Sequence, residues 1–259
     1  MGIVNVTPDS FSDGGLLSTA SVAVEHALRL VDEGADILDI GGESTRPGAQ
    51  PVPAGQELDR VIPVLEALHG LGIPLSVDTQ KSEVMVAAIR AGASMINDVN
   101  ALQAEGALDA VATSSAALCL MHKQGEPQTM QQEPRYRDVV VEVQEFLAAR
   151  VAAALAAGVA RERLLIDPGF GFGKSLQHNL TLLRQLDRLD ALGVPLLAGL
   201  SRKTMLGAIT GNAVGERVHA SVAAAVLAVM KGARILRVHD VRATRDALKV
   251  IGAVEREYE

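Results

Sequence analysis

Cysteine and aromatic residues are scarce in this sequence, and their scarcity excludes several kinds of chemistry. The 259 residues include one cysteine, no tryptophan, two tyrosines and four phenylalanines. Cys119 has no second cysteine with which to form an intramolecular disulfide, and it lies in an apolar run, which indicates a buried residue in a reducing compartment. With so few rings, stacking on nucleosides or aromatic caging of a cation cannot be the main means of recognition. Hydrogen bonds must therefore provide most of the selectivity.

Basic blocks and long apolar segments are also absent. The formal net charge of -7 argues against a surface for nucleic acid or for anionic lipid. The N-terminus lacks the basic and apolar segments of an export signal, and no apolar run approaches the roughly 20 residues that span a bilayer. The sequence predicts small-molecule substrates, a cytoplasmic location, and no nucleic-acid or membrane partner.

Short apolar runs alternate along the chain with Ala- and Leu-rich stretches that have helical spacing. The eight expected strands are residues 2–7, 35–42, 73–79, 94–99, 117–122, 164–169, 194–201 and 233–241. The eight expected helices are residues 21–33, 57–68, 82–91, 107–113, 136–157, 179–192, 216–231 and 243–255. Continuously apolar strands are typical of a parallel sheet covered on both faces. Eight such units without a linker predict a single (β/α)8 TIM barrel over residues 1–259, rather than an open doubly wound sheet.

Polar residues stand at the C-terminal end of every expected strand. An Asp or Asn in this position can simply cap the next helix. Eight sets on one face instead favour an active site, because the C-terminal ends of barrel strands converge on the face where such sites are built. The residues at these ends include Asn5, Asp39, Asp78, Asn97, His122, Asp167, Lys203 and Arg237.

Some of these groups suit an anion, and others suit a flat nitrogen heterocycle. Arg237 and His239 are two residues apart in an expected strand, so they would share one face and form an anion clamp. The alternative for Arg237 is a salt bridge to a neighbouring Asp, since an isolated buried charge is costly. Asp78 and Asp167 can accept paired N–H donors, and Asn97 can both donate and accept.

The segment PGFGFGKS, residues 168–175, looks like a nucleotide loop but fails as one. Pro168 stands where a Walker A loop needs its first Gly, and the glycines are spaced GxGxG rather than GxGxxG. HExxH, CxxC and GxSxG motifs are absent from the sequence. Zinc hydrolysis and triad chemistry therefore have no support.

Two long loops, residues 7–19 and 43–55, follow the first and second expected strands. Both are rich in Gly, Pro and Ser, and they are longer than usual βα connections. A floppy insertion is the alternative, but Phe11, Thr45, Arg46 and Pro47 are unusual spacers. We expect these loops to be lids over the barrel mouth.

Eight motifs occur in order along the chain: NVTPDSFSDGG (5–15), DIGGESTRPGA (39–49), SVDT (76–79), IND (96–98), LMH (120–122), DPGFGFGK (167–174), SRKTMLG (201–207) and RVHD (237–240). Together they make the chain closely resemble the bacterial dihydropteroate synthases, from Met1 to about Val250. The resemblance implies condensation of 6-hydroxymethyl-7,8-dihydropterin diphosphate with 4-aminobenzoate in folate biosynthesis, which gives 7,8-dihydropteroate and diphosphate. It also implies a sulfonamide target and a homodimer formed through outer helices.

The resemblance assigns roles to individual residues. It implies that the pterin is bound by Asp78, Asn97, Asp167 and Lys203. It implies that the diphosphate is bound by Asn5, Thr45, Arg46, Arg237 and His239, with Mg2+ bridging diphosphate oxygens and Asn5. It implies that the aminobenzoate slot is lined by Phe11, Pro47, Lys203 and Thr204, with Ser201 next to both substrates. The catalytic groups implied are Asp78, Asp167, Lys203, Arg237 and His239.

The mechanism that the resemblance implies is dissociative: the C–O bond to diphosphate breaks first, and the aniline nitrogen captures the pterin-methyl cation. This agrees with the absence of a recognisable activated nucleophile in the sequence. One alternative is a pterin-binding methyltransferase barrel that acts with a corrinoid protein, but it would not need SRKTMLG or RVHD. The other alternative is a non-catalytic barrel that serves to bind a partner.

Overall fold

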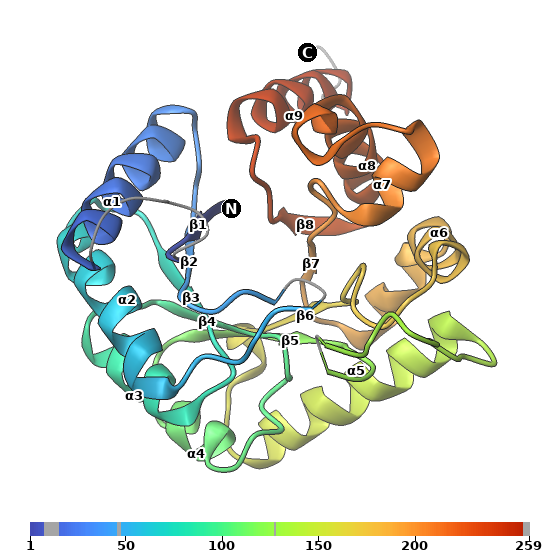
Figure 1. Cartoon of the computed structure of the whole chain (residues 1–259). Helices are drawn as coiled ribbons and strands as arrows, with labels where there is room; N and C mark the ends of the chain where they lie inside the picture. The colour runs from blue at the N-terminus through green and yellow to red at the C-terminus, as the bar shows by residue number, and fades with distance from the viewer. Residues whose placement is uncertain (8–15, 46–47, 127, 256–259) are drawn as a thin grey trace.

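Eight parallel strands and the helices between them form a closed ring (Figure 1). The computed structural model describes residues 1–7, 16–45, 48–126 and 128–255. The strands are β1 (Gly2–Asn5), β2 (Leu38–Gly41), β3 (Leu75–Asp78), β4 (Met95–Asp98), β5 (Ala117–Met121), β6 (Leu164–Asp167), β7 (Leu196–Ala198) and β8 (Ala233–Leu236). Each pairs with the next in sequence, and the sheet closes where the Ile3 amide donates to the Val238 carbonyl at 3.1 Å. The predicted (β/α)8 barrel is confirmed.

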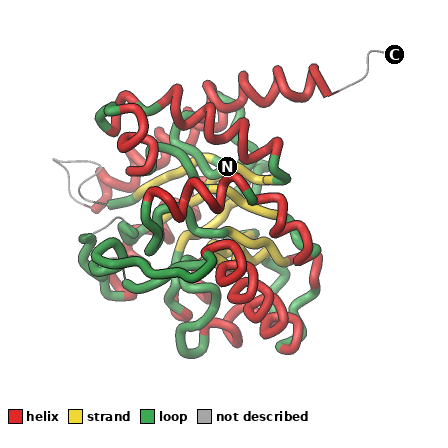
Figure 2. The backbone as a smooth tube through the Cα atoms, turned by 90° about the vertical axis from the view of Figure 1, so that its right-hand side faces the viewer, coloured by secondary structure: helices red, strands yellow, loops and turns green. Residues whose placement is uncertain are grey.

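The α-helices lie outside the strands, as Figures 1 and 2 both show. They are α1 (Leu16–Asp32), α2 (Ala54–Leu68), α3 (Ser82–Arg90), α4 (Ala107–Ala112), α5 (Val139–Ala156), α6 (Leu176–Arg184), α7 (Thr204–Thr210), α8 (Val218–Met230) and α9 (Val241–Glu255). The 3-10 segments are η2 (Arg161–Arg163), η3 (Leu186–Leu192) and η4 (Val214–Glu216). Within the described ranges, no helix combines the length and apolar character needed to span a membrane.

Two helix boundaries differ from the expected ones for a visible reason. The helix α6 begins at Leu176, before the expected start, because Ser175 and His178 form a reciprocal capping box. The helix α5 begins only at Val139, where the Asp138 carboxylate accepts from the Val140 amide at 2.9 Å. The additional helix α7 falls in a stretch for which the sequence predicted no helix.

Side chains alternate along each strand between the helices and the barrel interior, and this alternation creates the site. On β2 and β3, Ile40 and Val77 belong to the large core shared with the helices, whereas Asp39 and Ser76 contact each other on the other face. Inside the barrel, a separate apolar cluster contains Met1, Met95, Cys119, Leu165 and Leu197. Cys119 is buried, as predicted. Among the described residues, the barrel interior thus combines this apolar cluster with polar side chains such as Asp39 and Ser76.

Candidate functional site

Asp39, in the middle of β2, is the most connected carboxylate of the barrel mouth. It is fully buried, and its Oδ1 accepts a hydrogen bond from Ser76 Oγ at 2.6 Å. Its Oδ2 accepts from Arg237 Nε at 2.6 Å and from Asn97 Nδ2 at 3.2 Å. We expected Asp39 among the polar residues at the strand ends but assigned it no binding or catalytic role. The available signal was a charged residue inside a short apolar strand.

Arg237 bridges two carboxylates. Its Nη2 donates to Asp78 Oδ2 at 2.8 Å while its Nε is held by Asp39, so the salt-bridge alternative is present in the structure. No described residue accepts a hydrogen bond from Nη1, and the side chain is 20% exposed. Because a guanidinium has five donors in a rigid fork, two carboxylates can fix one edge and leave the other free for a ligand.

Burial and neighbouring charges shift the pKa values of Asp78, Asp167 and Lys203. Burial raises the pKa of Asp78 to about 7, against the opposing charge of Arg237. Burial also raises the pKa of Asp167, although the Gly169 amide donates to it at 2.7 Å and favours the carboxylate. Burial and the charge of Arg237 lower the pKa of Lys203 to about 8, although Asp167 and Asp78 oppose the change.

Asn97 has a buried acceptor that nothing in the described protein satisfies. It follows Ile96 on β4 and stands beside Asp78 in the sheet register. Its Nδ2 is used by Asp39, but its Oδ1 is buried without a hydrogen-bond partner among the described residues. A buried acceptor in this state is costly, and a ligand that carries an N–H donor would satisfy it.

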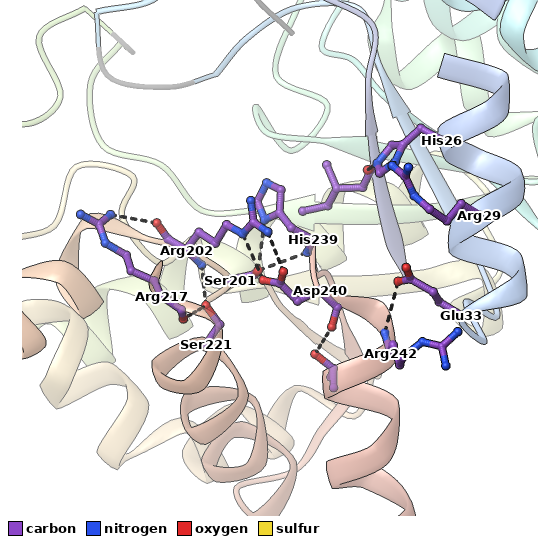
Figure 3. Close-up of polar contacts among 12 residues, drawn as sticks. His26, Arg29, Glu33, Ser201, Arg202, Arg217, Ser221, His239, Asp240 and Arg242 are labelled. Carbon is purple, nitrogen blue, oxygen red and sulfur yellow. Dashed lines mark hydrogen bonds and ion pairs between the residues drawn. The ribbon is translucent and has the colours of Figure 1, made fainter. Parts of the chain in front are cut away.

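A second network joins the loop after β7 to the loop after β8 (Figure 3). Arg202 donates to Asp240 through Nε at 3.0 Å and Nη2 at 2.6 Å, and its amide donates to Ser221 Oγ at 2.9 Å. Ser201 Oγ accepts from the His239 amide at 3.1 Å and lies 3.1 Å from His239 Nδ1. The strand β8 ends at Leu236, so Arg237 and His239 both lie beyond the strand rather than on one of its faces as expected. These contacts fix the chain immediately before Lys203.

The remaining predicted residues are less closely tied to this network. Asn5 is half-buried at the end of β1, and no described residue hydrogen-bonds its side chain. Thr45 is half-buried, and Thr204 is exposed at the start of α7. Phe11, Arg46 and Pro47 lie outside the described residues.

The mouth offers a metal little protein coordination. No group of three His, Cys, Asp or Glu side chains suited to a metal ion occurs within the described ranges. Asn5 offers one hard amide oxygen at the end of β1. Mg2+ commonly keeps several waters and takes other ligands from substrate phosphates. This donor set therefore fits a Mg2+ ion that arrives with a diphosphate, and not one held in a protein cage.

Comparisons with known proteins all lead to one group of enzymes. The sequence matches the family of pterin-binding enzymes over residues 1–239. A dihydropteroate synthase of Neisseria meningitidis serogroup B is 55% identical over 257 residues, which cover 96% of this chain and 90% of the relative. The structure of Xanthomonas albilineans dihydropteroate synthase with 4-aminobenzoic acid has a TM-score of 0.94 at 59% identity, covering 100% of this chain and 93% of that one. Another structure of the Xanthomonas enzyme, in complex with 7,8-dihydropteroate, has a TM-score of 0.90 at 55% identity, covering 100% of this chain and 94% of that one.

Proposed function

This chain belongs to the dihydropteroate synthases among the pterin-binding enzymes, and from that premise we propose that its barrel mouth joins 6-hydroxymethyl-7,8-dihydropterin diphosphate to 4-aminobenzoate. It is an enzyme that transfers an alkyl group. The products are 7,8-dihydropteroate, diphosphate and the proton lost by the aniline nitrogen. The observation that carries the proposal is the charged network of the mouth, in which Arg237 bridges Asp39 and Asp78.

The pterin is recognised through hydrogen bonds with Asp167, Asn97, Asp78 and Lys203. Asn97 Oδ1 has no partner among the described residues and can accept from a pyrimidine N–H. Asp167 offers a carboxylate to the amidine-like edge, and Lys203 reaches the 4-oxo side. The apolar cluster that includes Cys119 and Leu165 closes the bottom of this pocket and keeps water from it.

The diphosphate is held by Arg237, His239, Asn5, Thr45 and Arg46. Support for Arg237 comes from its Nη1, which donates to no described residue and lies away from the edge that the two carboxylates bind. Asn5 would hold Mg2+ through its amide oxygen, and the ion, when bound, would neutralise charge on the diphosphate oxygens.

The reaction begins with ionisation. The C–O bond to the diphosphate breaks, its electron pair leaves with the diphosphate, and the pterin-methyl carbon becomes a delocalised cation. Asp78 and Asp167 stabilise this cation electrostatically in a site of low dielectric. The nitrogen of 4-aminobenzoate then forms the C–N bond and loses a proton. Phe11, Pro47, Lys203 and Thr204 line the slot for this second substrate, with Ser201 beside both substrates, and the two loops exclude water.

Incubation of the protein with the pterin diphosphate, 4-aminobenzoate and Mg2+ tests the function. We expect dihydropteroate and one diphosphate per turnover, and a wild-type protein that forms neither would overturn the assignment. In the same assay, Arg237→Lys should lower kcat on the order of 100-fold, because a point charge cannot bridge both carboxylates and also bind a phosphate. Wild-type kcat in this variant would remove Arg237 from the diphosphate site.

We also propose a homodimer formed through α7, α8 and α9. These helices lie together in Figure 1, and α8 packs against α9. Among the described residues, the large apolar side chains that are more than half exposed all lie on these helices or on η4: Ile209, Val214, Leu227, Met230, Val250 and Val254. The helix α8 is apolar on nearly all sides, which is typical of a buried helix. A second copy of this chain would cover the face that is left open.

A further inference from the structure

Lys174 is a buried cation that the proposed reaction does not use. The residue is 2% exposed, although lysine is rarely buried without a partner. Its Nζ lies 2.9 Å from His122 Nδ1 and donates to the carbonyl oxygens of Gly169 at 2.9 Å and Phe172 at 3.1 Å. The His122 carbonyl is a further acceptor at 3.4 Å. The β6–α6 loop is thus folded around an ammonium group.

The protonation state of His122 agrees with this arrangement of hydrogen bonds around Lys174. Burial and, to a smaller extent, the charge of Lys174 lower the pKa of His122 to about 3, so the imidazole is neutral and its Nδ1 can accept. Burial lowers the pKa of Lys174 to about 7. Carbonyl oxygens from three directions favour the charged form, because they can only accept hydrogen bonds.

The loop has little freedom to adopt another path. Gly169 has φ +67°, and a Cβ there would lie 1.9 Å from the His122 carbonyl oxygen. The Gly171 amide donates to Asn179 Oδ1 at 2.8 Å, and Tyr136 Oη donates to the Gly173 carbonyl at 2.8 Å. The Lys174 ammonium therefore lies at the centre of a loop that is also held by hydrogen bonds at Gly171 and Gly173.

Two of the three carbonyls that accept from Lys174 belong to residues that contact groups assigned to the pterin pocket. Gly169, whose carbonyl accepts from Nζ, donates its own amide to Asp167 Oδ1 at 2.7 Å. Phe172, whose carbonyl also accepts from Nζ, places its ring 4.3 Å from the Nζ of Lys203. The Lys174 ammonium is thus connected, through one intervening residue in each case, to Asp167 and to Lys203.

We propose that Lys174, held by His122, is a positioning residue that sets Asp167 through Gly169 and Lys203 through Phe172. It touches no substrate itself, and the proposal rests on the assignment of Asp167 and Lys203 to the pterin. Lys174 does not act as a phosphate-binding lysine, because its ammonium is enclosed by its own loop. The similarity of GFGFGK to a nucleotide loop is therefore one of composition alone.

The test compares Lys174→Met, Phe172→Leu and the double variant in steady-state assays, with Lys249→Met as the matched control. Lys249 lies on α9 with a side chain that is 71% exposed. Wild-type turnover is measured first, so that failure of the proposed function is recognised separately. We expect Lys174→Met to raise KM for the pterin diphosphate about tenfold or more, because a displaced pocket binds its ligand less well. Lys249→Met should match the wild type.

The double variant distinguishes positioning from stability alone. If Lys174 acts through Phe172, the double variant should raise KM little beyond Lys174→Met, since both changes interrupt one connection. A purely structural role would lower the folded fraction, and therefore the apparent kcat, while KM stayed at the wild-type value. That result, or KM effects that multiply in the double variant, would overturn the proposal.

A second variant covers the case in which Lys174→Met fails to fold. His122→Phe keeps a ring against Phe146, whose centroid lies 4.9 Å from that of His122, and removes only the Nδ1 acceptor. Three carbonyls then still surround the ammonium, so we expect a folded protein with a smaller rise of about threefold in the same KM. An unchanged KM in folded His122→Phe would also overturn the proposal.

Discussion

The protonation of Asp78 sets how much negative charge the barrel mouth offers to a cation. Burial raises the pKa of this carboxyl to about 7, so it carries a proton below that pH and is ionised above it. The proposed role requires the ionised form. We therefore expect kcat/KM for the pterin diphosphate to rise with pH up to about 7 and to level off above it.

The Asp78→Asn variant identifies the group that is responsible. It should lower kcat/KM by roughly 100-fold, since it removes a preorganised charge, and it should lack the acidic limb of the profile. Asp187→Asn, at a side chain that is 58% exposed, is the matched control and should retain the wild-type profile. An acidic limb that persists unchanged in Asp78→Asn would assign the titration to another group.

Single residues differ in how well the sequence predicted them. Asp78, Asn97 and Asp167 stand at strand ends, and parallel strands in a closed barrel bring such ends together, so their meeting was predictable. The two ion-pair partners of Arg237 could not be predicted, because Asp39 and Asp78 precede it by 198 and 159 residues. Sequence spacing carries no information on contacts over such separations.

The loop after β2 is anchored by a charged cluster that the sequence did not suggest. Glu43 Oε2 accepts from Lys81 Nζ at 2.6 Å and from the Val52 amide at 2.7 Å, which ties both ends of the loop together. Lys81 also pairs with Glu57, a fully buried residue in the first turn of α2. The loop that contains Thr45 therefore depends on Lys81.

Replacement of Lys81 tests this dependence. Lys81→Met leaves the Glu57 carboxylate buried without its cation, so we expect the free energy of unfolding to fall by about 3 kcal/mol. We also expect kcat/KM for the pterin diphosphate to fall at least about fivefold, because the loop loses its anchor. Lys231→Met, at a side chain that is 40% exposed, controls for the substitution. Lower stability with unchanged kcat/KM in the folded enzyme would mean that the cluster serves the fold alone.

The sequence predicted helices and strands where the residues show a local periodicity. It did not predict elements whose limits are set by contacts between residues far apart in the sequence. All eight expected strands are present, although each is shorter than its expected range. The expected strand 194–201 ends early, and α7 follows it. Arg202 has a φ angle of +57°, and its side chain forms an ion pair with Asp240. A contact between residues 38 positions apart cannot be read from the sequence of one loop.

At the scale of the whole molecule, closure of the barrel follows from the number of βα units. Val238 hydrogen-bonds both Met1 and Ile3, so the chain beyond β8 pairs with β1 and brings Arg237 beside β2. That residues 1–259 form one domain, and that the protein is cytoplasmic, stay predictions. The open apolar face could not be recognised in advance, since it combines residues of four separate segments.

The proposed homodimer depends on this face, and charge is the means to test it. In an isologous dimer each substituted side chain meets its own symmetry mate or a near neighbour, so added like charges repel. Met230 is 68% exposed on α8 and Val254 is 79% exposed on α9. We expect the wild type to sediment as a dimer and the Met230→Lys/Val254→Lys variant as a monomer.

Leu71→Lys, at a residue that is 38% exposed between α2 and β3, should remain a dimer. Turnover should persist in the monomer, because Arg237, Asp39 and Asp78 are joined within a single barrel. A monomeric wild type, or a variant that still pairs, would show that this face serves another purpose.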